Sequence, residues 1–89
     1  METKEQEELL IEEVITTEYN LILYNDDFNT FDHVIACLIS ICKHTQQQAE
    51  QCTYLVHYKG KCSVKVGSIE KLEPMLIALQ MQDLSAEIK

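Results

Sequence analysis

Two short groups of polar residues stand out in this chain because together they could hold a cation. Asn25-Asp26-Asp27 places an amide and two carboxylates directly after an apolar run, and His57 lies three residues before Gly60. Amide carbonyl, carboxylate and unprotonated imidazole groups all accept hydrogen bonds, which suits a positively charged donor. Neither group adjoins a phosphate-binding loop or a paired nucleophile and base, so we expect binding rather than catalysis. From the residues alone, a turn with a solvated aspartate pair and a core histidine are alternatives.

The acidic composition excludes several classes of partner. The 89 residues carry a formal net charge of -8, which argues against nucleic acid because its binding depends on Lys and Arg. The same charge argues against anionic membrane surfaces. No apolar run approaches the ~20 residues of a membrane span, and the first residues do not resemble a signal peptide. We therefore expect one small domain that works in the cytoplasm, as a monomer.

The four cysteines do not form a recognisable metal motif. Cys37, Cys42, Cys52 and Cys62 include no C-x-x-C pair, whereas a structural zinc site usually has closely paired ligands. Each lies in an apolar pattern, which is typical of buried thiols in a reducing compartment. We expect no metal and no cofactor.

Polar and apolar periodicity predicts two helices between the first two strands. Residues 19–24 are apolar and aromatic and predict a strand, and residues 61–66 alternate as a second strand does. Between them Thr30 and Thr45 can each cap a helix, and Gly60 suits the left-handed residue that follows the second helix.

The last third of the chain predicts one more helix and one more strand. Ser68 can cap a short turn over residues 69–72. Pro74 lacks an N–H, so we expect the helix proper to begin near Glu73. Residues 84–88 alternate and predict the last strand. Three residues of this helix are expected to face the core: Leu76, Ile77 and Leu79.

The order β-α-α-β-α-β predicts a two-layer α+β domain over residues 19–89, with three helices on one face of a three-stranded sheet. Residues 1–18 contain seven of the fifteen acidic residues and no strong cap. We interpret them as an acidic, flexible extension.

Two segments resemble a known family, the ClpS adaptors of the Clp proteases. Residues 21–28, Leu-Ile-Leu-Tyr-Asn-Asp-Asp-Phe, resemble the strand of that family and its apolar-N-D-D-aromatic end. Residues 55–61, Leu-Val-His-Tyr-Lys-Gly-Lys, are similar to its apolar-x-V-H-x-x-G-K segment. The interval between Asn25 and His57 also matches, and the resemblance extends over residues 19–79.

The resemblance implies an adaptor without catalytic activity. Such a domain recognises N-degrons: it binds proteins whose first residue has a free α-amino group and is Leu, Phe, Tyr or Trp. It delivers them to a ClpA- or ClpC-type unfoldase. By resemblance, the substrate α-amino group is bound by Asn25, Asp26 and His57, and the substrate backbone by Asp27 and Asn29. His57 accepts only while one ring nitrogen is unprotonated, so acid should weaken binding.

The resemblance also implies an apolar pocket and a docking surface. The pocket for the first side chain is expected to be lined by Tyr24, Phe31, Val34, Thr53, Val56 and Leu84. The unfoldase is expected to dock on Glu70 and Glu73.

Several positions depart from the family pattern. The family commonly has Thr at position 29, Pro at 30, Met at 31 and 53, and Lys at 75, where this chain has Asn29, Thr30, Phe31, Thr53 and Met75. We expect a pocket that is tighter at position 31 and roomier at position 53, with a shifted preference among first residues.

Other interpretations stay open at this point. His33 and His44 have no motif around them and are expected at the surface or at helix ends. One alternative function is a ClpS-like modulator of the unfoldase that binds no N-degron. A module like the ribosomal stalk domain, and a small enzyme using Asp26, Asp27 and His57 as acid and base, are two more.

Overall fold

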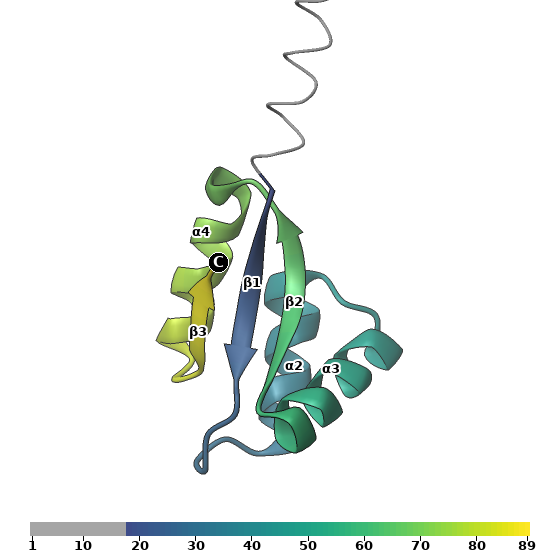
Figure 1. Cartoon of the computed structure of the whole chain (residues 1–89). Coiled ribbons are helices and arrows are strands. Elements are labelled where there is room, and N and C mark those ends of the chain that lie inside the picture. The colour runs from purple at the N-terminus through teal and green to yellow at the C-terminus, as the bar shows by residue number, and fades with distance from the viewer. Residues whose placement is uncertain (1–17) are drawn as a thin grey trace, which may run out of the picture.

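The computed structural model describes residues 18–89, which form a three-stranded antiparallel sheet with three helices (Figure 1). The elements in chain order are β1 (Tyr19–Tyr24), α2 (Phe31–Cys42), α3 (Gln46–Lys59), β2 (Lys61–Gly67), α4 (Ile69–Met81) and β3 (Ser85–Ile88). The predicted α+β fold is confirmed. The predicted acidic extension, residues 1–18, lies outside the described residues except for Glu18.

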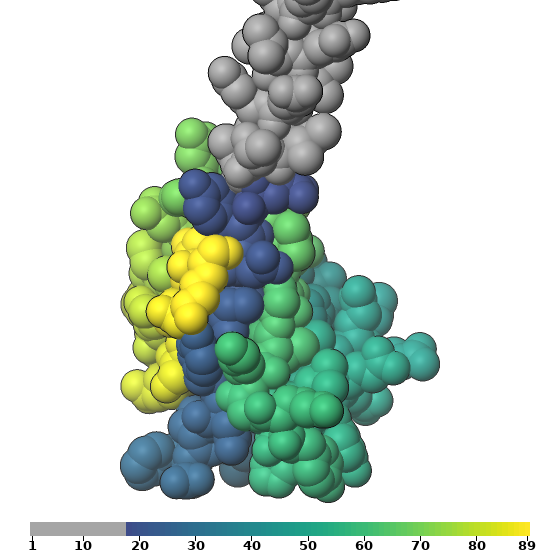
Figure 2. Space-filling model, viewed as in Figure 1, coloured from purple at the N-terminus to yellow at the C-terminus, as the bar shows by residue number. Residues whose placement is uncertain are grey.

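The first strand is the centre of the sheet and divides it into a buried and an open face. β1 pairs with β2 on one side and with β3 on the other, both antiparallel. Leu21 and Leu23 are fully buried against the helices, whereas Ile22 and Tyr24 alternate onto the opposite face. Figure 2 shows the three strands side by side on this open face, with none of the helices α2, α3 and α4 lying over them.

A β-bulge in β2 changes the expected alternation of that strand. The pairing with β1 skips from Lys65 to Ser63, so Val64 is the extra residue. Val64 is buried, and Lys65 also reaches toward the helices, where its Nζ donates to the carbonyl of Cys42 at 3.0 Å. Val66 is turned to the open face, where 48% of its surface is exposed. A simple alternation would have buried Val66 beside Val64.

Side-chain caps begin all three helices, as predicted. Thr30 accepts from the backbone N–H of His33, and Ser68 accepts from that of Lys71. Thr45 forms a complete capping box with Gln48. These caps satisfy backbone donors that a helix leaves free in its first turn.

The helix after β2 begins earlier than the sequence predicts. α4 is continuous from Ile69, and Pro74 lies inside it as the sixth residue. Pro74 has no N–H to donate to the carbonyl of Glu70, an exposed residue, so the helix lacks this one bond. Because Leu72 is fully buried, its packing holds the first turn against the sheet. With this start, Ile77 lies on the solvent side and is 54% exposed, so its predicted core position is wrong.

His44 follows α2, as expected of a helix-end residue, but it is buried rather than at the surface. Lys43 adopts the left-handed conformation with φ 62°, which turns the chain inward. The Nε2 atom of His44 then lies 2.6 Å from the carbonyl oxygen of Val64. His44 thereby connects the end of α2 to the bulge in β2.

Within residues 18–89 no helix is both long and apolar enough to cross a bilayer. Cys37 and Cys42 are buried, and Cys52 and Cys62 are half-buried; all four are free thiols. Burial raises the pKa of Cys42 to about 11, and burial together with neighbouring Cys62 raises that of Cys52 to about 12.

Gly60→Ala is expected to lower the free energy of unfolding by about 1 kcal/mol. Gly60 has φ 91°, where an L-residue is strained, although an added Cβ would meet no atom within 4 Å. Gly67→Ala is the matched control, because the near neighbour there is the flexible side chain of Lys71. Urea denaturation followed by circular dichroism measures both changes, and equal losses in the two variants would contradict the prediction.

Candidate functional site

A hollow of about 300 Å³ lies where the end of β1 meets the start of α2 and the second half of α3. All eleven residues predicted to bind a substrate border it: Tyr24, Asn25, Asp26, Asp27, Asn29, Phe31, Val34, Thr53, Val56, His57 and Leu84. Leu23 and Thr30 also border it and were not anticipated. Both are sequence neighbours of predicted residues, which was the only signal for them.

One backbone hydrogen bond brings the two polar motifs together. The N–H of Asn25 donates to the carbonyl of Gly60 at 2.9 Å, at the point where α3 ends and β2 begins. The N–H of Gly60 donates to the carbonyl of Val56 and closes α3. His57, one residue after Val56, is therefore held beside the end of β1.

The carboxylate of Asp26 builds the loop between β1 and α2. Its Oδ1 accepts from the backbone N–H groups of Phe28 at 2.9 Å and Asn29 at 2.8 Å, and its Oδ2 accepts from the Asn29 side chain at 2.8 Å. Partial desolvation pushes the pKa of Asp26 upward, but the hydrogen bonds from Asn29 and Phe28 and nearby His33 outweigh it. The net result is a pKa below the ordinary value.

Asn29 has no amide hydrogen left for a ligand. Its Nδ2 donates to Asp26 and also to the carbonyl of Asp83, at 2.9 Å, in the turn after α4. A side-chain amide has two hydrogens, and both are used. The Asn29 amide hydrogens thus tie the loop to the turn before β3, and the predicted contact with the substrate backbone would use the Asn29 side-chain oxygen as acceptor.

Three acceptor side chains at the edge of the hollow are exposed and differ from Asp26 in this respect. Asn25, Asp27 and His57 are accessible to solvent, and none of their side chains joins the hydrogen bonds that Asp26 and Asn29 make within residues 18–89. They offer a carbonyl, a carboxylate and an imidazole to a ligand in the hollow. This arrangement suits a cationic donor better than an anion.

Aromatic contacts fix the entrance. Phe31, the first residue of α2, is 40% exposed. Its ring meets that of His57 edge-on at a centroid distance of 5.2 Å and that of Tyr54 at 6.1 Å. Edge-to-face pairs at such distances are favourable, so Phe31 and His57 hold each other in place.

The interior of the hollow is apolar. Val34, Val56 and Leu84 are buried there. Thr53 is also buried, and its hydroxyl donates to the carbonyl of Ala49 at 2.7 Å, one helical turn earlier. Because this hydroxyl is already satisfied, Thr53 adds no unpaired polar group to an apolar wall.

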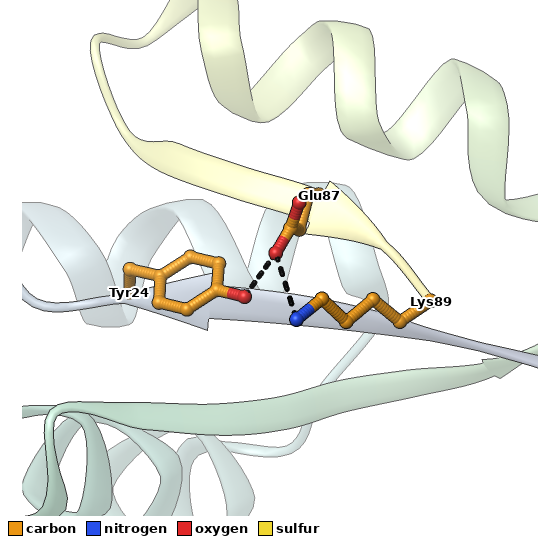
Figure 3. Close-up of polar contacts among 3 residues, drawn as sticks. All are labelled: Tyr24, Glu87 and Lys89. Atoms are coloured by element: carbon orange, nitrogen blue, oxygen red, sulfur yellow. Dashed lines mark hydrogen bonds and ion pairs between the residues drawn. The ribbon is translucent and has the colours of Figure 1, made fainter.

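Tyr24 borders the hollow, but its hydroxyl points elsewhere. It donates to the carboxylate of Glu87 on β3, which also lies 3.4 Å from the Lys89 ammonium group (Figure 3). This hydrogen bond raises the pKa of Tyr24 and lowers that of Glu87. The network links the end of β1 to β3 across the open face.

The remaining predicted residues lie away from the hollow. Glu70 and Glu73 are exposed in the first two turns of α4. In the part of the chain that the structure describes, no group of three or more His, Cys, Asp or Glu side chains is placed to hold a metal ion.

Comparison with known proteins identifies the family. The model of the family described as ATP-dependent Clp protease adaptor protein ClpS matches residues 15–87. The chain therefore belongs to the ClpS family, which consists of adaptors rather than enzymes.

Curated relatives agree with this assignment. The chain is 48% identical over 56 residues to the ClpS adapter protein of Thermosynechococcus vestitus, covering 62% of this chain and 60% of that protein. It is 41% identical over 70 residues to that of Treponema denticola, covering 74% of this chain and 69% of the relative. The matches thus span three fifths to two thirds of these relatives.

A solved structure shares the fold. Agrobacterium tumefaciens ClpS2 bound to L-phenylalaninamide superposes with a TM-score of 0.76, at 18% identity, over 82% of this chain and 95% of that one. At this identity the likeness concerns the fold.

Asp26→Ala is expected to lower the free energy of unfolding at pH 7 by about 1–3 kcal/mol, because two backbone donors and the Asn29 amide lose their acceptor. Folding lowers the pKa of Asp26, so its contribution to the free energy of unfolding is fully present when the pH is above the unfolded pKa of 3.8. It is lost as the pH falls through the folded value.

Urea denaturation of the wild type and of Asp26→Ala at several pH values from 7 to 2.5 measures the difference between their free energies of unfolding. Asp27→Ala is the control. Asp27 lies beside Asp26 but carries none of these hydrogen bonds. A gap between wild type and Asp26→Ala that stayed constant down to pH 2.5 would contradict the prediction.

Proposed function

We propose that this protein is an N-degron adaptor of a Clp protease, which binds substrates by their free α-amino group and large apolar first residue. One observation carries the proposal: exposed acceptors border an apolar hollow. Asn25, Asp27 and His57 lie at the edge, and Val34, Val56 and Leu84 lie inside. The volume of about 300 Å³ is at the lower end for ligand pockets, which suits a single side chain.

The acceptors suit an α-ammonium group. A free α-amino group has a pKa of about 7.7–8.0 and is mostly cationic at neutral pH. In the proposed complex it donates to the Asn25 carbonyl, to a ring nitrogen of His57 and to Asp26, directly or through water. Asp26 Oδ2 accepts one bond in the loop, from Asn29, and so retains a lone pair for the ligand. Asp27 faces the substrate backbone, and Asn29 positions the loop.

The first side chain supplies the second part of the binding energy. Burying a Leu or Phe side chain contributes about 1.5–3 kcal/mol, and each charge-assisted hydrogen bond about 1.5–3 kcal/mol. After the cost of association, these contributions correspond to about micromolar affinity. The ClpS2 structure supports the proposal, because its ligand, L-phenylalaninamide, has a free α-amino group and one apolar side chain.

Anisotropy of dye-labelled peptides tests the proposal. Peptides that begin with Leu, Phe, Tyr or Trp are expected to bind. A peptide with an acetylated N-terminus is not, because acetylation removes the positive charge and leaves a single N–H for several acceptors. Asn25→Ala and His57→Ala are each expected to weaken binding at least tenfold. Binding should also fall above about pH 8, where the α-amino group loses its proton.

Lys59→Ala is the control, because Lys59 is exposed, lies two residues after His57 on α3 and does not border the hollow. The same experiment ranks the affinities of the peptides that begin with Leu, Phe, Tyr or Trp. This ranking shows whether Phe31 and Thr53 shift the preference for the first residue. Equal affinity for free and acetylated peptides would contradict the proposal. Absence of all binding in a folded sample would instead favour a modulator of the unfoldase.

Delivery requires a second surface, which we propose includes Glu70 and Glu73 on α4 together with residues 1–18. Both glutamates are exposed, and neither borders the hollow. The partner in this proposal is a ClpA- or ClpC-type unfoldase.

A chain lacking residues 1–18 is expected to bind Leu-initiated peptides normally but to fail in their degradation by the unfoldase with ClpP. Glu70→Lys with Glu73→Lys is expected to weaken co-purification with the unfoldase without changing peptide affinity. Degradation by the shortened chain at the normal rate would contradict the role of the extension.

A further inference from the structure

The open face of the sheet takes no part in the function proposed above, apart from Tyr24 at its end. Val66 is 48% exposed there, and Ile22 is half-buried. A sheet is normally stabilised by covering its apolar surface with a second layer, so this uncovered face is a candidate for an interaction. Strand pairing places three residues of each strand on it: Asn20, Ile22 and Tyr24 of β1, Lys61, Ser63 and Val66 of β2, and Ser85, Glu87 and Lys89 of β3.

The open face carries more positive than negative charge, although the chain is acidic as a whole. Lys61 and Lys89 lie on it, with Glu87 as the one carboxylate. Glu87 accepts from Tyr24 and lies 3.4 Å from the Lys89 ammonium group (Figure 3). Within residues 18–89, Lys61 forms no ion pair. An occupant that combines aliphatic side chains with carboxylates would therefore complement this face.

The segment that precedes β1 has this composition. Residues 1–17 contain six glutamates and one lysine. Leucine, isoleucine and valine occur in this segment only between positions 9 and 15. Four of these aliphatic residues, at positions 10, 11, 14 and 15, have the i, i+1, i+4, i+5 spacing of an apolar stripe along one side of a helix.

The length of the chain allows this stripe to reach the open face. Tyr19 begins β1 beside Gly67, at one end of the sheet. Residues 16–18 are enough for a reversal, because connections between a helix and a strand commonly have about 2–6 residues. A helix over residues 7–15 would be about 14 Å long, and β1 is about 17 Å long. Such a helix therefore matches the length of the face that it would cover.

Two other arrangements fit the charges less well. A second copy of the chain, docked symmetrically, would bring two faces of the same positive sign together. A depression between α2 and α3 also exposes apolar side chains, but Asp32 and Glu50 line it, and no Lys, Arg or His does. It would therefore repel the glutamates of the segment before β1.

We propose that residues 7–15 pack as an amphipathic helix on the open face of the sheet. The apolar stripe covers Ile22 and Val66, and the flanking glutamates lie near Lys61 and Lys89. This contact does not depend on the binding of N-degrons. It holds residues 1–18 on the surface of the adaptor, so the delivery proposed above requires their release.

Tryptophan fluorescence tests the contact. The chain contains no Trp, so the emission of Val66→Trp in the full chain reports on the open face alone. It is expected at a shorter wavelength than in the same protein with Leu10→Asp and Val14→Asp, because the docked helix shields the indole from water. Gln6→Asp with Thr17→Asp adds the same charge without changing the apolar stripe, and is expected to keep the shorter wavelength.

Charge reversal tests the electrostatic part of the contact. In the Val66→Trp background, Lys61→Glu is expected to lower the equilibrium constant for docking about threefold, and so to shift the emission toward longer wavelength. Lys43→Glu changes the net charge equally, but Lys43 follows α2, on the other side of the sheet. This control is expected to keep the emission of the parent.

Amide NMR spectra provide a measurement without any substitution in the sheet. The full chain is compared with the full chain carrying Leu10→Asp and Val14→Asp. Chemical shifts are expected to differ at Ile22 and Val66. They are expected to agree at Ala36 and Ala78, which line a depression between α2 and α4.

Four results would overturn the inference. The first is agreement of the two NMR spectra at Ile22 and Val66. The second is a difference at Ala36 and Ala78 in their place, which would assign the segment to the depression between α2 and α4. The third is a Trp emission that moves to longer wavelength on dilution, which would assign the face to a second copy. The fourth is an equal effect of Lys61→Glu and Lys43→Glu, which would indicate net charge rather than a local contact.

Discussion

The link at Gly60 is the constraint on which the arrangement of the site depends. Its N–H closes α3 and its carbonyl accepts the N–H of Asn25, so one residue joins two motifs that lie far apart in the sequence. The turn requires a left-handed backbone, which glycine adopts without strain. Because β2 begins at the next residue and pairs with β1, the sheet register fixes His57 beside the end of the central strand.

Much of the fold could be predicted because its signals are local. The Ser and Thr caps, the capping box and Gly60 each act over three or four residues, and the structure contains all of them. The errors arose where tertiary contacts outweigh local preference. Burial of Leu72 stabilises a turn that Pro74 weakens, which moves the start of α4. The bulge at Val64, for which no prediction was made, turns Val66 to the open face. Neither effect leaves a pattern in the nearby sequence.

The residues around the hollow could be named from the resemblance to the ClpS family, but not what each one does there. Asp26 and Asn29 have side chains suited to a ligand, yet most of their bonding capacity goes to the loop and to Asp83. The contact between Phe31 and His57 depends on side-chain rotamers in two helices.

The last strand connects the hollow to the end of the described chain. Two residues directly precede β3: the Asp83 carbonyl accepts from Asn29, and Leu84 lines the hollow. Within residues 18–89, β3 itself pairs only with β1. Terminal strands of this kind open at low free-energy cost compared with the core. Opening of β3 would release one wall of the hollow, so a ligand held there opposes the opening by mass action. Occupancy of the hollow and hydrogen-exchange protection of the C-terminal strand are therefore thermodynamically linked.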